Sequence, residues 1–179
     1  MKEQKYAKYV NKFVDSLTIN RDPKKWDVWG KCTTPMIFDK RHFDEMPLHV
    51  ESMIIYQAGA GWGLNHPCEG TLGGKPYEDV PMYHETGEAY MLLGTDPKNP
   101  HDLGGVIEVW LGEGKDAEKF TVTESVCIWI PAGVVHMPVY FTRVDRPIML
   151  VVVLAGPMWT GGFAKELPPD CKYVIKPLK

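Results

Sequence analysis

The chain has 179 residues, of which 44% are hydrophobic and 24% are charged. These values are typical of one globular domain. The net charge is −3 with both signs interspersed, so there is no concentrated basic face for phosphate binding and we predict no nucleic-acid partner. The N-terminus lacks the apolar core of a signal peptide and the longest apolar run is too short to cross a bilayer. The four scattered cysteines indicate reduced thiols. We therefore expect a cytoplasmic protein without a membrane partner.

One amphipathic helix is predicted at the N-terminus. Between residues 3 and 17, apolar side chains recur every three or four residues, at Tyr6, Val10, Phe13, Val14 and Leu17. We expect residues 1–30 to form a helix and an arm that pack against a sheet or against a second subunit.

From residue 31 to residue 179 the sequence predicts a single β domain, because short apolar or alternating runs are separated by Gly, Pro, Asn and Asp. The predicted strands are Met36–Phe38, Val50–Ala58, Glu88–Leu93, Val106–Leu111, Lys119–Thr123, Val126–Ile130, Met137–Thr142 and Ile148–Leu154. Eight strands suffice for a small closed barrel. Two long loops, 59–83 and 94–105, are candidates to cover or line a site.

Two segments carry side chains that suit a metal site. The first, PMYHETGEAYMLLG, places His84 four residues before Glu88, and if Glu88 opens a strand then Glu88 and Tyr90 share one face of it. The second, WIPAGVVHMPVYF, has a strand, a Pro-Ala-Gly turn, and His136 where the next strand begins.

Together the two segments resemble the paired motifs of the cupin superfamily. The first cupin motif has His-x-His, then three or four residues, then Glu and later Gly, and His84 and Glu88 match its second histidine and its glutamate. The second motif has Pro-x-Gly, two residues and His, matched by Pro131, Gly133 and His136. The resemblance spans about residues 50–154.

The chain departs from this pattern at three positions. Met82 stands at the first histidine, Ser125 lies near the missing opening glycine, and Tyr140 replaces the closing asparagine. His66, in the long loop upstream, is the candidate for replacing the missing ligand, although a loop histidine is more commonly just solvated.

The resemblance implies an all-β, cupin-like β-barrel (jelly roll) with the N-terminal helix added to it. It also implies a divalent metal ion (Fe, Mn or Zn) held by His84, Glu88 and His136. Such a set binds one side of the ion and leaves positions open for substrate, water or dioxygen. The alternative is a barrel without metal, in which both histidines are hydrogen-bonded core residues and Glu88 pairs with a cation such as Arg143 or Arg146.

The side chains expected near the barrel mouth are mostly aromatic and indicate a small organic substrate: Met53, Tyr56, Tyr90, Trp110 and Tyr140. Tyr90, which shares a face with Glu88, is one candidate catalytic residue. Glu108, a charge within the apolar run VIEVWL, is the candidate acid or base if it faces inward. The other interpretation is that alternate positions of this strand face solvent.

Three functions follow as hypotheses. The first is a metal-dependent cupin enzyme acting on a small oxygenated organic molecule, which could be cyclic or aromatic, by dioxygenation or by non-redox hydrolysis, isomerisation or decarboxylation. The second is a non-catalytic small-molecule-binding cupin, and the third is a metal-free structural barrel. We also expect a homodimer, because cupins commonly pair sheet to sheet and unpaired strand edges favour association.

Overall fold

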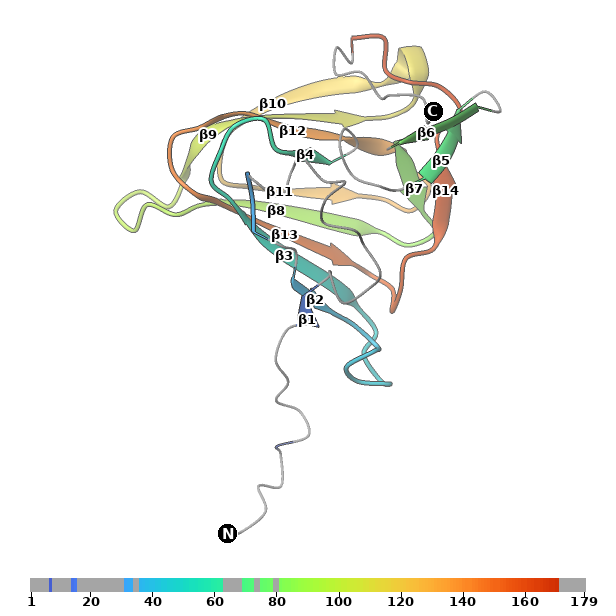
Figure 1. The fold of residues 1–179 in the computed structure, drawn as a ribbon, viewed down its shortest axis with the longest axis horizontal. Helices are drawn as coiled ribbons and strands as arrows, with labels where there is room; N and C mark the ends of the chain where they lie inside the picture. Colours follow the sequence, from blue (N-terminus) through green and yellow to red (C-terminus); the bar gives the residue numbers. More distant parts are fainter. Residues whose placement is uncertain are drawn as a thin grey trace.

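A computed structural model describes Ala7 and residues 14–15, 31–33, 36–62, 69–72, 75–78 and 81–170. These residues form two antiparallel sheets that pack face to face (Figure 1). The first sheet has the strand order β1 (Val14–Asp15), β2 (Met36–Phe38), β3 (His49–Ile55), β13 (Ile148–Leu154), β8 (Glu88–Gly94) and β11 (Val126–Ile130). The all-β, jelly-roll fold class is thereby confirmed.

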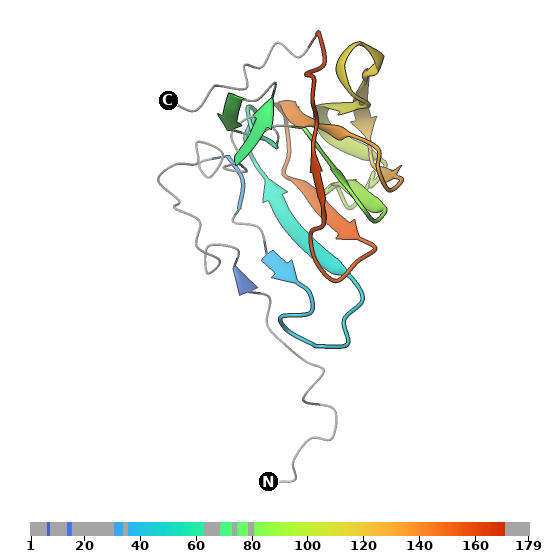
Figure 2. The ribbon, with the colours of Figure 1, turned by 90° about the vertical axis from the view of Figure 1, so that its right-hand side faces the viewer.

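The second sheet has the order β10 (Glu118–Glu124), β9 (Asp102–Leu111), β12 (His136–Val144), β7 (Met82–His84) and β14 (Gly161–Phe163), with β4 (Gly61–Trp62) paired to β12. β5 (Glu69–Leu72) and β6 (Lys75–Glu78) form a separate hairpin, and a 3-10 turn, η5, spans Gly114–Asp116. In Figure 2 the end that carries β7 and β14 faces the viewer, with β14 (red) crossing in front of the sheets. The described residues hold no helix long and apolar enough to span a membrane.

The eight predicted strands are all present. β2, β11 and β13 have the predicted bounds, and the other five differ by one to four residues at their ends. The alternation of apolar side chains identified them because successive residues of a strand face opposite sides of a sheet. The predicted loop 59–83 contains β4, β5 and β6 and the start of β7, which are too short to give a periodic signal.

The predicted helix is wrong at Val14–Asp15. These residues form β1, which pairs with the edge strand β2 through Val14 opposite Ile37 and Asp15 opposite Met36. Pairing with an exposed sheet edge gives hydrogen-bond partners to the backbone N–H and C=O groups of both strands. A tertiary contact of this kind readily overrides helix propensity. Apart from Ala7, which is in a 3-10 turn, the rest of the predicted helix lies outside the described residues.

The core lies between the sheets and is built in rows across the first one. Leu92, Leu150 and Met53 lie in one such row, and each is at most 3% exposed. Leu154 lies two rows closer to the end of the sandwich that carries β7, between His49 of β3 and Glu88 of β8. The apolar filling of the sandwich therefore changes to polar side chains at one end.

Candidate metal site

The three predicted ligands lie together at that polar end. His84 is the last residue of β7, Glu88 the first of β8, and His136 the first of β12. All three are at least 96% buried. The backbone N–H of Gly133 donates to the His84 carbonyl at 2.8 Å, so the turn that leads into His136 is fastened to the strand that carries His84.

A turn and a bulge hold His136 in place. Val134 N–H donates to the Pro131 carbonyl at 3.2 Å, and Gly133 has φ of 79°, so this β-turn needs a glycine-like residue at its third position. After His136 the register of β12 against β9 shifts by one residue, with Met137 at φ of 81°. Bulges of this kind redirect side chains next to functional sites.

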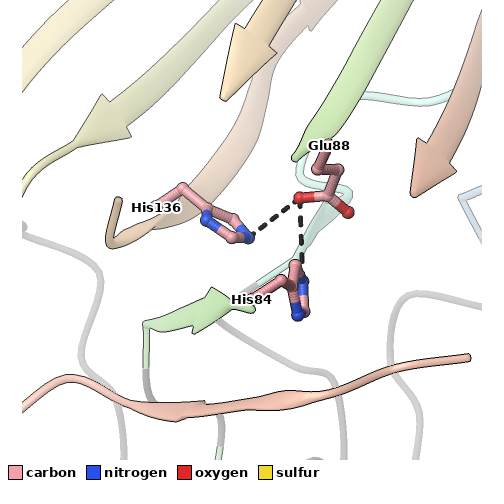
Figure 3. Close-up of side chains that lie close together, drawn as sticks. All are labelled: His84, Glu88 and His136. Carbon is pink, nitrogen blue, oxygen red and sulfur yellow. Dashed lines mark ion pairs between the residues drawn. The ribbon is translucent and has the colours of Figure 1, made fainter. Parts of the chain in front are cut away.

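The donor atoms converge on one point (Figure 3). Glu88 Oε2 lies 3.0 Å from His136 Nε2 and 3.7 Å from His84 Nε2. One donor atom from each of the three residues lies within 4.8 Å of the other two, which is the spacing of ligands around a single ion.

The opposite nitrogen of each imidazole faces a backbone carbonyl. His136 Nδ1 lies 3.0 Å from the Val134 oxygen, and His84 Nδ1 lies 3.3 Å from the Thr160 oxygen. Since a carbonyl only accepts hydrogen bonds, both Nδ1 atoms carry the proton and donate it. The Nε2 lone pairs are then directed at the centre of the cluster, as they are in histidine ligands supported by an outer hydrogen bond.

Burial also keeps His84 neutral. It lowers the pKa of this imidazole, an effect that the Glu88 carboxylate opposes and His136 reinforces. A neutral imidazole is the form that binds a metal ion.

The cluster fits a divalent cation because hydrogen bonds do not satisfy its polar atoms. Both carboxylate oxygens of Glu88 and the Nε2 atoms of His84 and His136 are buried without a hydrogen-bond partner. A buried polar group left unpaired costs roughly 1–3 kcal/mol. An ion held by these three residues would reduce that cost, and a set of two imidazoles and one carboxylate suits Fe(II), Mn(II) or Zn(II).

The metal-free alternative predicted a cation beside Glu88. Arg143 instead pairs with Asp145 at 3.0 Å, and Arg146 pairs with Asp102. Among the described residues no lysine or arginine forms an ion pair with Glu88. The ion pair with a lysine or arginine that would have stabilised the Glu88 carboxylate without a metal is therefore not found among the described residues.

The place of the missing first histidine is occupied by Met82. This side chain lies on β7 with His84, faces inward like it, and is opposite His136 in the register of β7 with β12. His66, the predicted substitute ligand, lies outside the described residues.

Tyr90 lies one row inward from Glu88 on the same face of β8, with its ring centroid 5.9 Å from that of His136. Its pKa is raised well above the usual value by burial, and further by the nearby Glu88 carboxylate, so the phenol keeps its proton.

Glu108 faces away from the interior. It pairs with Lys119 at 3.1 Å, and its cross-strand neighbours are Thr121 and Tyr140 on the outer side of the second sheet. The condition under which it was the candidate acid or base, an inward orientation, is not met. In the run VIEVWL either set of alternate residues could face the interior. Packing against the opposing sheet decides which set does so.

The residues expected at the mouth are only partly there. Met53 and Tyr90 face the interior, whereas Tyr56 is exposed and Tyr140 lies on the outer side next to Glu108. Trp110 is fully buried, and its indole N–H donates to Asp170 at 3.0 Å. A pocket of about 200 Å³ opens beside His84 instead, between β7 and β14, and Trp159 and Thr160 complete its wall.

A second buried polar group adjoins the cluster and was missed in the sequence. His49 Nδ1 lies 3.0 Å from Asp39 Oδ2, and His49 Nε2 lies 3.0 Å from Glu51 Oε1. The indole N–H of Trp159 also donates to His49 Nε2, at 2.9 Å. The Trp159 ring stands edge-on to that of His84 with centroids 4.7 Å apart, so it connects this group to the metal site.

Asp39 is anionic within this group. Burial raises its pKa, but hydrogen bonds from Arg41 lower it more, to about 2. A carboxylate at His49 Nδ1 fixes a proton on that nitrogen, so Nε2 is the acceptor for the indole N–H of Trp159. Only the inward alternation of the sequence HVE could have suggested this arrangement, because its members become neighbours only in the folded sheet.

No protein-family model matches the sequence, and no curated relative does either. Among solved structures, Peruvianin-I, described as a cysteine peptidase from Thevetia peruviana latex, matches with a TM-score of 0.52 and 10% identity over 92% of this chain and 82% of the other. A recombinant oxalate oxidase in complex with glycolate matches with a TM-score of 0.50 and 11% identity over 87% and 63%. An oxalate decarboxylase of Bacillus subtilis gives 0.46 and 13% over 73% of this chain and 27% of that one.

These likenesses concern the fold, and this chain spans only about a quarter of the length of the decarboxylase. Oxalate oxidase, which matches with a TM-score of 0.50, is a cupin. The class that fold and site define here is a two-sheet β-sandwich with a His/Glu/His cluster at one end. The protein has the cupin fold, and its cluster fits a cupin metal site.

Proposed function

We propose that the protein is a metal-dependent cupin enzyme that acts on a small oxygenated organic molecule. The observation that carries the proposal is the convergence of two imidazole Nε2 atoms and a carboxylate that are buried and have no hydrogen-bond partner. His84, Glu88 and His136 would hold the ion. When bound, a divalent metal supplies a Lewis acid with open positions for the oxygen atoms of a chelating substrate.

The protein's own groups then divide the remaining tasks. The pocket between β7 and β14 would bind the organic part of the substrate next to His84, with Trp159 as its aromatic wall. Tyr90, which keeps its proton because its pKa is raised by burial, would donate a hydrogen bond or a proton near Glu88.

Glu51 replaces Glu108 as the proposed acid or base. It faces the interior from β3, in the same cross-strand row as Tyr90, with Val152 between them. Its Oε1 lies 3.0 Å from His49 Nε2, and His49 is itself oriented by Asp39.

Metal content tests the proposal directly. Protein purified under anaerobic conditions should contain about one divalent ion per chain by elemental analysis, and His136→Ala should lose it. His49→Ala is the matched control, because His49 is equally buried at the same end of the sandwich but lies outside the cluster, and it should retain the metal. Wild-type protein that binds no Fe, Mn or Zn after loading would refute the proposal.

Turnover is the second measurement. Oxygen consumption by the metal-loaded protein distinguishes dioxygenation from hydrolysis, isomerisation or decarboxylation. The panel should contain small molecules that can offer two oxygen atoms to one ion, including oxalate and glycolate, which are named with the fold relatives. Glu51→Gln should keep its metal and lose activity on whichever member reacts.

A further inference from the structure

The segment just before β14 joins the two sheets at the end that carries the metal site. The indole N–H of Trp159 donates to Nε2 of His49, which is the first residue of β3 in the first sheet. The carbonyl of the next residue, Thr160, accepts from the backbone N–H of Glu85 at 3.1 Å and from His84 Nδ1, at the end of β7 in the second sheet. Two consecutive residues are therefore bonded to opposite sheets.

The ligand cluster spans the same two sheets. His84 and His136 belong to the second sheet and Glu88 to the first. The 3.7 Å between Glu88 Oε2 and His84 Nε2 (Figure 3) therefore depends on how closely the sheets approach here and on the rotation of the His84 ring. A bridge between the sheets restricts the first of these variables, and a hydrogen bond at Nδ1 restricts the second.

A hydrogen bond, and not burial alone, holds Trp159 in place. Its side chain is 38% exposed, whereas His49 is 1% exposed. The indole stands edge-on to both neighbouring imidazoles, with its centroid 5.9 Å from that of His49 and 4.7 Å from that of His84. Since packing covers only part of this ring, the acceptor at its N–H decides where the ring lies.

Asp39 makes His49 a fixed acceptor. The Asp39 carboxylate holds the proton on His49 Nδ1 and is itself bonded by the Arg41 Nε at 2.8 Å and 3.0 Å. Only one tautomer of His49 is then present, and its Nε2 lone pair faces the indole. Replacing a buried polar pair by apolar side chains of the same shape can be neutral or even stabilising, so the stability of the fold alone does not require this arrangement.

We propose that His49 is a positioning residue of the metal site, because it anchors Trp159 and thereby sets the ring of His84. Asp39 orients His49, and the Thr160 carbonyl transmits the anchor to His84. The inference rests on the proposed metal site and assigns a role to residues outside its ligand set. Because Trp159 also lines the pocket beside His84, the same anchor fixes the pocket wall next to the ion.

Titration of the full chain with Co(II), followed by the d–d absorption of the bound ion, tests the proposal. His49→Leu removes the acceptor, and Trp159→Phe removes the donor but keeps an aromatic ring beside His84. Both variants should still take up one Co(II), with a Kd raised roughly 10-fold and the same altered spectrum, because outer hydrogen-bond partners typically contribute 10–100-fold to metal affinity. Combining the two substitutions should add little, because both remove the same hydrogen bond.

His49→Gln is the rescue variant, since its amide oxygen can reach the position of Nε2 and accept the indole N–H. It should restore the wild-type Kd and spectrum. Met53→Leu is the matched control, because it changes a buried, inward-facing residue of the same strand two rows away, and it should behave as the wild type does. Circular dichroism checks that each variant is folded.

The outcomes separate this proposal from the proposed function. A wild type that takes up no Co(II) overturns both. A wild type that binds Co(II) while Trp159→Phe keeps the same Kd and spectrum overturns the positioning role and leaves the metal site intact. The role is also overturned if His49→Gln is as impaired as His49→Leu, or if the effects of the two single substitutions add in the double variant.

Discussion

Replacing Glu88 by glutamine should change the stability of the metal-free and metal-loaded protein in opposite directions. Without metal, both Glu88 oxygens and two imidazole nitrogens are buried and unpaired. An amide nitrogen at the position of Oε2, 3.0 Å from His136 Nε2, would donate a hydrogen bond to the lone pair that faces it. The substitution therefore removes an unpaired carboxylate and satisfies an unpaired nitrogen.

The magnitude follows from those atoms. Relieving one buried, unpaired polar group is worth roughly 1–3 kcal/mol. For a chain of this size 1 kcal/mol corresponds to roughly 2–4 °C in Tm. Metal-free Glu88→Gln should therefore melt a few degrees above the metal-free wild type. In the presence of metal the order reverses, because an ion at 1,000 times its Kd stabilises the wild type by roughly 4.1 kcal/mol, more than the variant gains without metal, and the variant has lost its only anionic ligand.

The assay is thermal unfolding by circular dichroism, first with chelator and then with excess MnCl2. Glu51→Gln is the matched control, since it also neutralises a buried glutamate that faces a histidine, and its response to metal should equal that of the wild type. If Glu88 were instead the carboxylate of a hydrogen-bonded polar core, Glu88→Gln would destabilise the metal-free protein, and neither protein would respond to metal. That pair of results would refute the metal site.

Four other outcomes are expected. Burial lowers the pKa of His84 below its usual 6.5, so the unfolded chain takes up a proton at a higher pH than the folded chain does. The free energy of unfolding of the metal-free protein, measured with urea, should therefore fall as the pH drops below about 6.5. The fall should be less steep in His84→Gln, which lacks this imidazole. Metal titrations should also show weaker binding at that pH, because protons compete for Nε2. Gly133→Ala should lower the free energy of unfolding by roughly 1 kcal/mol through its φ of 79°, and Gly133→Asn should cost less because asparagine tolerates that region; equal losses would contradict the turn geometry. Gly161→Ala would bring a Cβ within 1.9 Å of the Tyr83 oxygen, so β14 should separate from β7, and calorimetric titration should show weaker metal binding because Thr160 no longer supports His84.

The strands could be predicted from the sequence because their signal is local. Each strand alternates its side chains, so short apolar runs such as the one in β13 identify themselves without knowledge of their partners. The cluster was predictable for a related reason. His84 and Glu88 flank one turn, and Pro131 to His136 form another, so local spacing fixes much of the geometry of each ligand.

Tertiary structure decided everything that depends on which face of a strand is covered. The parity that turns Glu51 inward and Glu108 outward is set by the opposing sheet, and either choice satisfies the local alternation. The contact of His49 with Asp39, ten residues earlier, and with Trp159, 110 residues later, exists only after β3 and the segment before β14 have come together. Val14–Asp15 became a strand because the edge of β2 was available to pair with them. Sequence periodicity indicates which secondary structure a segment favours by itself, whereas burial and strand pairing depend on the assembled sheets.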